Sequence, residues 1–255
     1  MRIISLNVNN FGGLVSKPLI KDYLYNEKPL WDDWNKAVMA WREKTKWENN
    51  VAVIVDYVRD FDVIVFQEVD TNSEAFKKLI KYLDEHFIVY PNKTEGKDYC
   101  IGFKSITVMF IKRCFNYTIM ADNFSTKKMK NVEINIDNKN IIGLHISMGD
   151  TDYWDSLIKH YNRLKDKKVL IIGDLNVYDR GTKQKEKFLE LLNCGAIDAW
   201  VQKGNSMHRA TSNTEKRIDY AIMSPLFYEE LVDISIDDVL RNKAITDHSA
   251  ISISI

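Results

Sequence analysis

The chain has 255 residues and no formal net charge, because its 36 basic side chains balance 36 acidic ones. Hydrophobic residues make up 45% of it, which excludes a disordered chain and is enough for a core that needs no disulfide. Proteins that bind nucleic acid non-specifically usually have a positive net charge. The zero net charge of this chain argues against that class but is compatible with a local basic patch.

Short β-branched segments bounded by Gly, Asp or Asn predict the strands of a covered sheet. In chain order they are residues 2–8, 62–66, 106–111, 141–146, 169–172, 218–223 and 249–255. Apolar residues at helical spacing predict helices, and these are residues 41–59, 73–82 and 185–192. Residues 12–35 have no clean period and contain Pro18 and Pro29, so we expect a long surface insertion there.

The alternation of strands with helices predicts an α/β (α+β) fold class. Short hairpin-like connections between residues 106 and 146 favour a four-layer sandwich, in which helices flank two mainly antiparallel sheets. No repeat or Pro/Ser-rich linker divides the sequence. We therefore expect one domain over residues 1–255 and a monomer.

Cysteine usage and the N-terminal sequence bear on the compartment. Cys100, Cys114 and Cys194 form no C-x-x-C pair, so neither a disulfide framework nor a zinc site is indicated. Residues 1–10 are too polar for a secretory leader, and no apolar run reaches the length of a membrane span. We expect a soluble, reduced, cytoplasmic protein.

Polar side chains lie at the ends of six predicted strands. They are Asn7, Glu68, His145, Asp174 with Asn176, Asp219, and Asp247 with His248. Loop-borne groups converge where the strands of a rigid sheet end. Carboxylate and amide oxygens suit Mg2+, and histidines beside carboxylates suit proton transfer and anion stabilisation. The pattern favours metal-assisted phosphoryl chemistry.

Each of these residues also has an ordinary structural explanation. Asn7 could sit in a turn, Asp174 could cap a helix, and His145 could be a core histidine. Asp219 could pair with Arg217. Their occurrence together at six strand ends is what favours a site. We expect Glu68, Asp174 and His248 to lie at the rim of the fold rather than in its core.

The sequence around these residues resembles the endonuclease/exonuclease/phosphatase superfamily, which includes deoxyribonuclease I, exonuclease III, sphingomyelinases and inositol polyphosphate 5-phosphatases. The resemblance rests on six blocks in the family's order, with Thr246 where the family usually has Ser. The blocks are SLNV (5–8), FQEV (66–69), GLHIS (143–147), IIGDLNV (171–177), RIDY (217–220) and TDHSAI (246–251).

The resemblance implies a deoxyribonuclease I-like fold, Mg2+ or alternatively Mn2+ as cofactor, and a role for each residue. Asn7, Glu68 and Asp247 would hold the metal. The catalytic residues would be His145, Asp174, Asn176, Asp219 and His248. Asp174 and Asn176 would orient or deprotonate the attacking water, Asp219 would orient His248 against the phosphate, and His145 would face the phosphate or the leaving group.

The substrate is less well defined by the sequence. The abasic-site branch of the family has an aromatic-rich segment before the RIDY block, whereas residues 208–216 contain no aromatic residue. We favour a nuclease that cleaves nucleic-acid phosphodiester bonds. The alternatives are a phosphatase or phosphodiesterase acting on a phosphorylated small molecule or lipid headgroup, and a binding module without activity. The complete set of catalytic residue types favours an enzyme.

Overall fold

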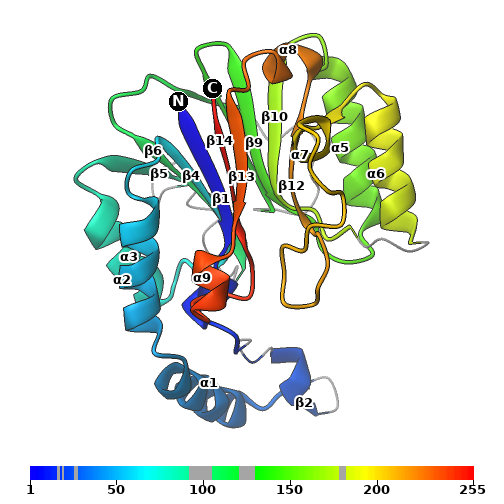
Figure 1. Ribbon diagram of the computed structural model, residues 1–255. Helices are drawn as coiled ribbons and strands as arrows, with labels where there is room; N and C mark the ends of the chain where they lie inside the picture. The colour runs from blue at the N-terminus through cyan, green and yellow to red at the C-terminus, as the bar shows by residue number, and fades with distance from the viewer. Residues whose placement is uncertain (16–17, 19, 26–27, 92–104, 121–129, 178–181) are drawn as a thin grey trace.

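The computed structural model describes residues 1–15, 18, 20–25, 28–91, 105–120, 130–177 and 182–255 (Figure 1). Within these residues two six-stranded sheets pack face to face, and helices cover the outer face of each. This confirms the four-layer sandwich expected from the sequence. Cys114 and Cys194 are free thiols, and Cys100 lies outside the described residues.

The first sheet has the order β13-β14-β1-β4-β6-β5. Its strands are β1 (Arg2–Asn7), β4 (Val63–Val69), β5 (Phe87–Tyr90), β6 (Ile106–Lys112), β13 (Asp233–Asp237) and β14 (Ala250–Ser254). The two central strands, β1 and β4, run parallel, and the other neighbours are antiparallel. The carboxyl ends of β1 and β4 therefore meet at one edge.

The second sheet has the order β11-β12-β10-β9-β8-β7. Its strands are β7 (Thr118–Ile119), β8 (Asn131–Ile136), β9 (Lys139–His145), β10 (Lys168–Asp174), β11 (Ile197–Asp198) and β12 (Asp219–Met223). Here β9 and β10 form the parallel central pair. The sheet is otherwise antiparallel, as the sequence predicted.

Alternation along the strands builds three apolar layers, because successive side chains of a strand face opposite sides of its sheet. In β4, Val63 and Val65 pack between the two sheets, whereas Ile64 and Phe66 face helices. In β10, Ile171 faces the helices of the other side. Strands with both faces buried explain the continuous apolar runs in the sequence.

In the described part of the chain, helices cover the outer face of each sheet (Figure 1). The first sheet packs under α2 (Trp47–Val58) and α3 (Glu74–Leu83), and the second under α5 (Thr151–Leu164) and α6 (Lys183–Asn193). Shorter helices lie in the connections. They are η1 (Asn9–Phe11), η2 (Ile20–Tyr23), α7 (Ala199–Gln202), α8 (Pro225–Tyr228) and α9 (Val239–Asn242).

The single helix expected over residues 41–59 is wrong. Helix α1 (Trp31–Thr45) ends and α2 begins around Lys46, whose φ of 48° is left-handed. The Asn50 side chain donates to the backbone oxygens of Thr45 (3.1 Å) and Phe11 (2.8 Å), which stabilises the break. No Gly or Pro marks it in the sequence.

The described residues between 14 and 45 form an arm that extends below the sandwich in Figure 1. It contains η2, the two-residue strands β2 (Leu24–Tyr25) and β3 (Lys28–Pro29), and α1. Trp41 attaches α1 to the beginning of the arm, because its indole N–H donates to the Val15 oxygen at 2.7 Å. The part of the insertion expected over residues 12–35 that the structure describes lies in this arm or at its base.

No helix in the described ranges combines the length and the apolar character that a membrane span requires.

Candidate active site

Strand register lines up three of the predicted site residues across the second sheet. Asp174 at the end of β10 pairs with His145 on β9 and with Asp219 on β12. In the first sheet, Asn7 pairs with Gln67, and Glu68 follows directly. The strand pairing therefore brings the polar side chains of each sheet to one edge of that sheet.

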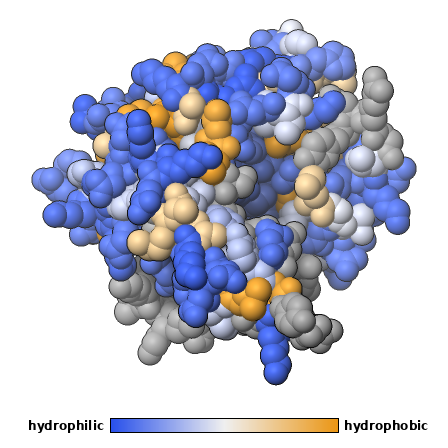
Figure 2. Space-filling view, turned by 90° about the horizontal axis from the view of Figure 1, so that it is seen from below, coloured by the Kyte–Doolittle hydropathy of each residue, from blue (hydrophilic) through white to orange (hydrophobic). Residues whose placement is uncertain are grey.

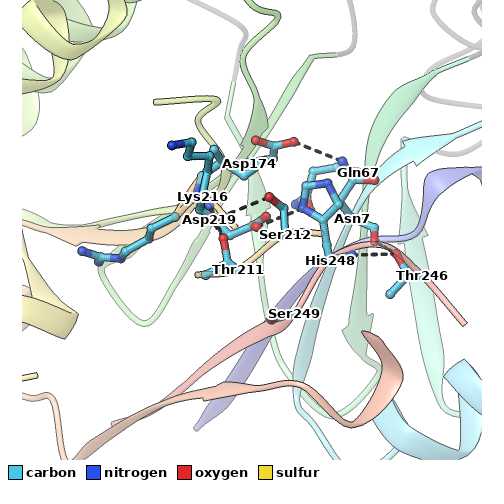
Figure 3. A network of polar contacts seen from close by, with 12 residues as sticks. Asn7, Gln67, Asp174, Thr211, Ser212, Lys216, Asp219, Thr246, His248 and Ser249 are labelled. Atoms are coloured by element: carbon cyan, nitrogen blue, oxygen red, sulfur yellow. Dashed lines mark hydrogen bonds and ion pairs between the residues drawn. The ribbon is translucent and has the colours of Figure 1, made fainter. Parts of the chain in front are cut away.

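Asn7 connects the two sheets at this edge. Its amide nitrogen donates to Asp174 Oδ2 at 3.1 Å and to Glu68 Oε1 at 3.2 Å. Figure 3 shows the contact between Asn7 and Asp174. The Asn7 oxygen accepts from the backbone N–H of Asn9 at 3.0 Å. In this arrangement Asn7 holds two carboxylates together and presents a donor to them.

The backbone turns Glu68 toward the site. Its φ of 56° is left-handed, and the pairing of β4 with β6 shifts register between Phe66 and Val69. A β-bulge of this kind re-aims a side chain, and left-handed non-glycine residues concentrate at functional sites. The sequence alone gives no sign of this bulge.

His248 and Asp219 form a buried pair. His248 Nδ1 lies 2.9 Å from Asp219 Oδ2, and the two residues are 6% and 2% exposed. Burial alone would lower the pKa of His248, but the charge and hydrogen bond of Asp219 raise it to about 10. The imidazole is therefore protonated at neutral pH and carries a second N–H for a substrate anion.

Asp174 occupies the centre of the site and is 2% exposed. Burial, followed by the negative charge of Asp219, raises the pKa of Asp174 to about 8. Its Oδ1 accepts from the backbone N–H of Asn176 at 2.9 Å. Asn176 has a left-handed φ of 49° and donates its amide to the Ile146 oxygen at 2.9 Å, so a tight turn fixes Asp174.

Gly173, the residue before Asp174 in β10, occupies a position that requires glycine. Its φ is +148°, and a Cβ atom there would lie 2.0 Å from the Leu144 oxygen. Gly143 in β9 is required for a different reason, because its Cβ would lie 2.4 Å from Val65 Cγ1 of the facing sheet. The glycines of the GDLN and GLH blocks thus allow close backbone approaches.

His145 lies between the carboxylates and a lysine. Its Nε2 is 3.7 Å from Asp174 Oδ2 and 3.9 Å from Glu68 Oε1, while its Nδ1 faces Lys130 Nζ at 3.5 Å. Burial, and then the positive charge of Lys130, hold the pKa of His145 well below its ordinary value. A lysine donor at Nδ1 selects the neutral tautomer that carries its proton on Nε2.

These groups surround a cleft of about 330 Å³. Its lining is polar and comes from both sheets: Glu68, His145, Ser147, Met148, Asp174, Asn176, Ser212, Asn213, Thr214, Ile218, Asp247 and His248. Figure 2 shows this lower face of the molecule, which is largely hydrophilic and hollowed near its centre. The volume is at the small end of ligand sites and fits a phosphate group with its nearest substituents.

The residues around the cleft fit a divalent cation. Ligand atoms of Glu68, His145 and Asp174 all lie within 4.8 Å of one another. The Oδ1 atom of Asp247 is buried and has no hydrogen-bond partner among the described residues. Hard oxygen donors, crowded carboxylates and an unsatisfied carboxylate oxygen together suit Mg2+ or Mn2+.

The structure brings all the predicted site residues together. Six line the cleft, and Asn7 and Asp219 are hydrogen-bonded to residues that line it. The expectation of rim positions is wrong for Asp174 and His248, which are 2% and 6% exposed, whereas Glu68 is half-buried.

Sequence reasoning missed Lys130 and the segment from Thr211 to Thr214. Lys130 directly precedes β8, a strand that was not predicted. The alternation of Val132, Ile134 and Ile136 with polar residues, followed by a turn into β9, was the available signal. It would have paired this strand with β9 and placed Lys130 beside His145.

Residues 4–248 match the Endonuclease/Exonuclease/phosphatase family, which is nearly the whole chain. The chain belongs to this family. The family's name covers nucleases and phosphatases, both of which hydrolyse phosphate esters. The matched residues include every predicted site residue, from Asn7 to His248.

Solved structures of other family-like proteins share the fold. An AP endonuclease from Archaeoglobus fulgidus has a TM-score of 0.66 at 12% identity, and the match covers 100% of this chain and 99% of that one. The 3'-5' exonuclease NExo from Neisseria meningitidis has a TM-score of 0.67 at 14% identity, with 100% and 99% coverage.

A third structure, of the 3' phosphatase NExo from Neisseria bound to product DNA hairpin, has a TM-score of 0.63 at 12% identity. That match covers 100% of this chain and 99% of the other. At these identities the similarity shows the fold alone. No curated protein sequence matches this member of the family.

Proposed function

We propose that the chain is a divalent-metal-dependent hydrolase of phosphate esters, and that its substrate is nucleic acid. The observation that carries the proposal is the closed cluster at the end of the sandwich. There, the Asp174 carboxylate and His248, which is held by Asp219, line one small cleft. Asp174 and His248 thus supply a base and an acid for the attack of water on phosphorus.

Each side chain has a defined task in this proposal. His248, held protonated by Asp219, donates its free N–H to a non-bridging phosphate oxygen and stabilises the charge that develops there. Asp174, held by Asn7 and the Asn176 backbone, accepts a proton from the attacking water. In the metal-free protein the pKa of Asp174 is raised to about 8, so a bound cation would have to displace this proton before the carboxylate could act as the base.

Glu68 and Asp247 are the proposed metal ligands, with Asn7 beside them. When bound, Mg2+ or Mn2+ supplies positive charge against the phosphate oxygens and offsets the repulsion among the carboxylates. In its present rotamer Asn7 presents nitrogen to the cluster, so its direct ligation requires rotation of the amide. Lys130 adds a fixed positive charge behind His145.

The choice of nucleic acid draws on the fold and on the cleft. The proteins of the same fold named above carry names that refer to abasic-site cleavage, 3'-5' exonuclease activity and 3' phosphatase activity on DNA. The residues that line the cleft here include no aromatic side chain within the described part of the chain. We therefore propose general phosphodiester cleavage and not specialised recognition of a base-less sugar.

A panel of esters tests the substrate class. Labelled single-stranded and duplex oligonucleotides, an abasic duplex and a 3'-phosphorylated oligonucleotide are incubated with the protein and Mg2+ or EDTA. The proposal expects metal-dependent shortening of ordinary strands without enhancement at the abasic site. If the protein releases phosphate from the 3'-phosphorylated strand and cleaves none of the other strands, it is a phosphatase. Hydrolysis confined to phosphorylated small molecules or lipids would overturn the nucleic-acid proposal.

A further inference from the structure

A buried threonine contacts both segments that carry the Asp219–His248 pair. Thr211 is 0% exposed, and its hydroxyl oxygen accepts hydrogen bonds from the backbone N–H groups of Ile218 and Asp219, each at 3.0 Å. On the opposite side, the Ile218 oxygen accepts from the N–H of Leu175. The backbone that presents Asp219 is therefore fixed between the Thr211 hydroxyl and the turn after Asp174.

The backbone of the same residue reaches the other half of the pair. The Thr211 oxygen accepts from the N–H of Ser249 at 2.8 Å, and the next residue, Ser212, forms an antiparallel bridge with His248. Figure 3 shows Thr211 and Ser212 beside Asp219 and His248. Thr211 is thus hydrogen-bonded to the residue that supplies the carboxylate and to the neighbour of the imidazole.

A tight loop holds Thr211 in this position. Its own N–H donates to the Lys216 oxygen at 2.9 Å, and the Ser212 N–H donates to the same oxygen at 3.2 Å. The loop closes because the Glu215 N–H donates back to the Ser212 oxygen at 3.1 Å. The segment that places Thr211 is therefore anchored to the chain that leads into β12.

We infer that Thr211 is a positioning residue, which sets the distance between Asp219 and His248 through its hydroxyl and its carbonyl. The inference rests on the proposed function, in which that pair stabilises the phosphate. Two groups from separate strands keep a 2.9 Å contact only if both backbones are fixed. Displacements of about 1 Å in such groups can cost about a hundredfold in rate.

The test compares Thr211→Val, which keeps the shape and removes the acceptor, with Thr211→Ser, which keeps the hydroxyl. Thr211→Val is expected to lower kcat about 10- to 100-fold with KM nearly unchanged, as losses of supporting hydrogen bonds do. Thr211→Ser is expected to stay within about threefold of the wild type, because its hydroxyl accepts the same bonds. Thr211→Ala is judged by the same readouts if the valine variant does not fold.

Ser224 offers a matched control at the far end of β12. Its buried hydroxyl accepts from the N–H groups of Val169 (3.0 Å) and Phe227 (3.3 Å) and donates to the Lys167 oxygen. Ser224→Ala removes a comparable backbone clamp away from the cleft. It is expected to lower thermal stability while leaving kcat unchanged.

A second readout is independent of turnover. In isotope-labelled protein, the His248 Nδ1 proton bound to Asp219 is expected far downfield in the proton NMR spectrum. It should persist in Thr211→Ser and Ser224→Ala and be lost or shifted in Thr211→Val. A valine variant that keeps both this proton and full kcat would overturn the positioning role. If the wild type hydrolyses no ester, the proposed function fails, and the NMR signal still decides whether Thr211 sets the pair.

Discussion

Asp174 on β10 lies directly opposite Asp219 on β12, so two buried carboxylates are cross-strand neighbours in the second sheet. Like charges at opposed positions repel, and burial removes the water that would screen them. Asp219 is hydrogen-bonded to His248. Burial of Asp174, and then the negative charge of Asp219, raise the pKa of Asp174 to about 8.

The first prediction concerns stability in the absence of metal. The folded pKa of Asp174, about 8, is above its unfolded value of 3.8, so this group's contribution to stability falls as pH rises between those values. His248, raised from 6.5 to about 10, stabilises the fold fully below 6.5 and loses that contribution as pH rises through 10. Both groups thus act in the same direction.

Thermal melts in EDTA between about pH 5 and pH 9 measure this effect, because that interval lies inside the pH range of the two titrations. The Tm is expected to fall with rising pH and to fall less steeply in Asp174→Asn, which cannot ionise. Added Mg2+ should raise the Tm most at high pH, where it no longer competes with the Asp174 proton. Equal slopes for the wild type and Asp174→Asn would contradict the raised pKa.

The second prediction tests Glu68 as a metal ligand. Glu68→Gln retains an oxygen for Asn7 but removes the charge that attracts a cation. The Mg2+ concentration for half-maximal activity is expected to rise about tenfold or more, with partial recovery at saturating Mg2+. Glu85→Gln, at an exposed position, is the matched control. An unchanged Mg2+ dependence in Glu68→Gln would remove Glu68 from the metal site.

The third prediction concerns Lys130, which fixes the His145 tautomer and adds positive charge near the cleft. Lys130→Met is expected to lower kcat/KM about tenfold or more, because a preorganised positive group is lost. Lys81→Met removes an exposed lysine from the end of α3 and should have no effect. Activity equal to the wild type in Lys130→Met would show that this lysine plays no part in the chemistry.

The fourth prediction concerns the close approach of the two sheets. Gly143→Ala places a methyl group 2.4 Å from Val65 Cγ1 and is expected to destabilise the fold by about 1–3 kcal/mol. Val65→Ala opens the same space, so the double variant should recover part of the loss. Chemical denaturation of the single and double variants measures the coupling. If the double variant loses as much free energy of unfolding as the two single variants together, the contact does not limit the spacing of the sheets.

The central strands and the site residues were predictable from the sequence for the same reason. A strand buried on both faces must be apolar, so a polar residue at its end stands out, as Asp174 does after residues 169–172. Of the strands missed in the two large sheets, β5, β7, β11 and β13 lie at the edges and β8 lies next to an edge. In β8, for example, Asn135 alternates with buried Ile134 and Ile136, so no continuous apolar run exists.

Other features depend on contacts that sequence patterns do not carry. The break at Lys46 is stabilised by Asn50, a side chain from the following helix. The bulge that turns Glu68 inward depends on the pairing of β4 with β6. Asp174 of the second sheet contacts Asn7 of the first sheet, and these two residues are far apart in the sequence. Each is a tertiary effect, which overrides local preference.

The most direct test of the central claim is nicking of supercoiled plasmid by the wild type, His248→Ala and His86→Ala, each with Mg2+ and with EDTA. His86 is an exposed histidine and serves as the matched control. The wild type and His86→Ala are expected to nick the plasmid only with Mg2+, and His248→Ala should be slower by about 10²–10⁴-fold. Equal nicking by His248→Ala and the wild type, or no Mg2+-dependent nicking by the folded wild type, would contradict the proposed nuclease site.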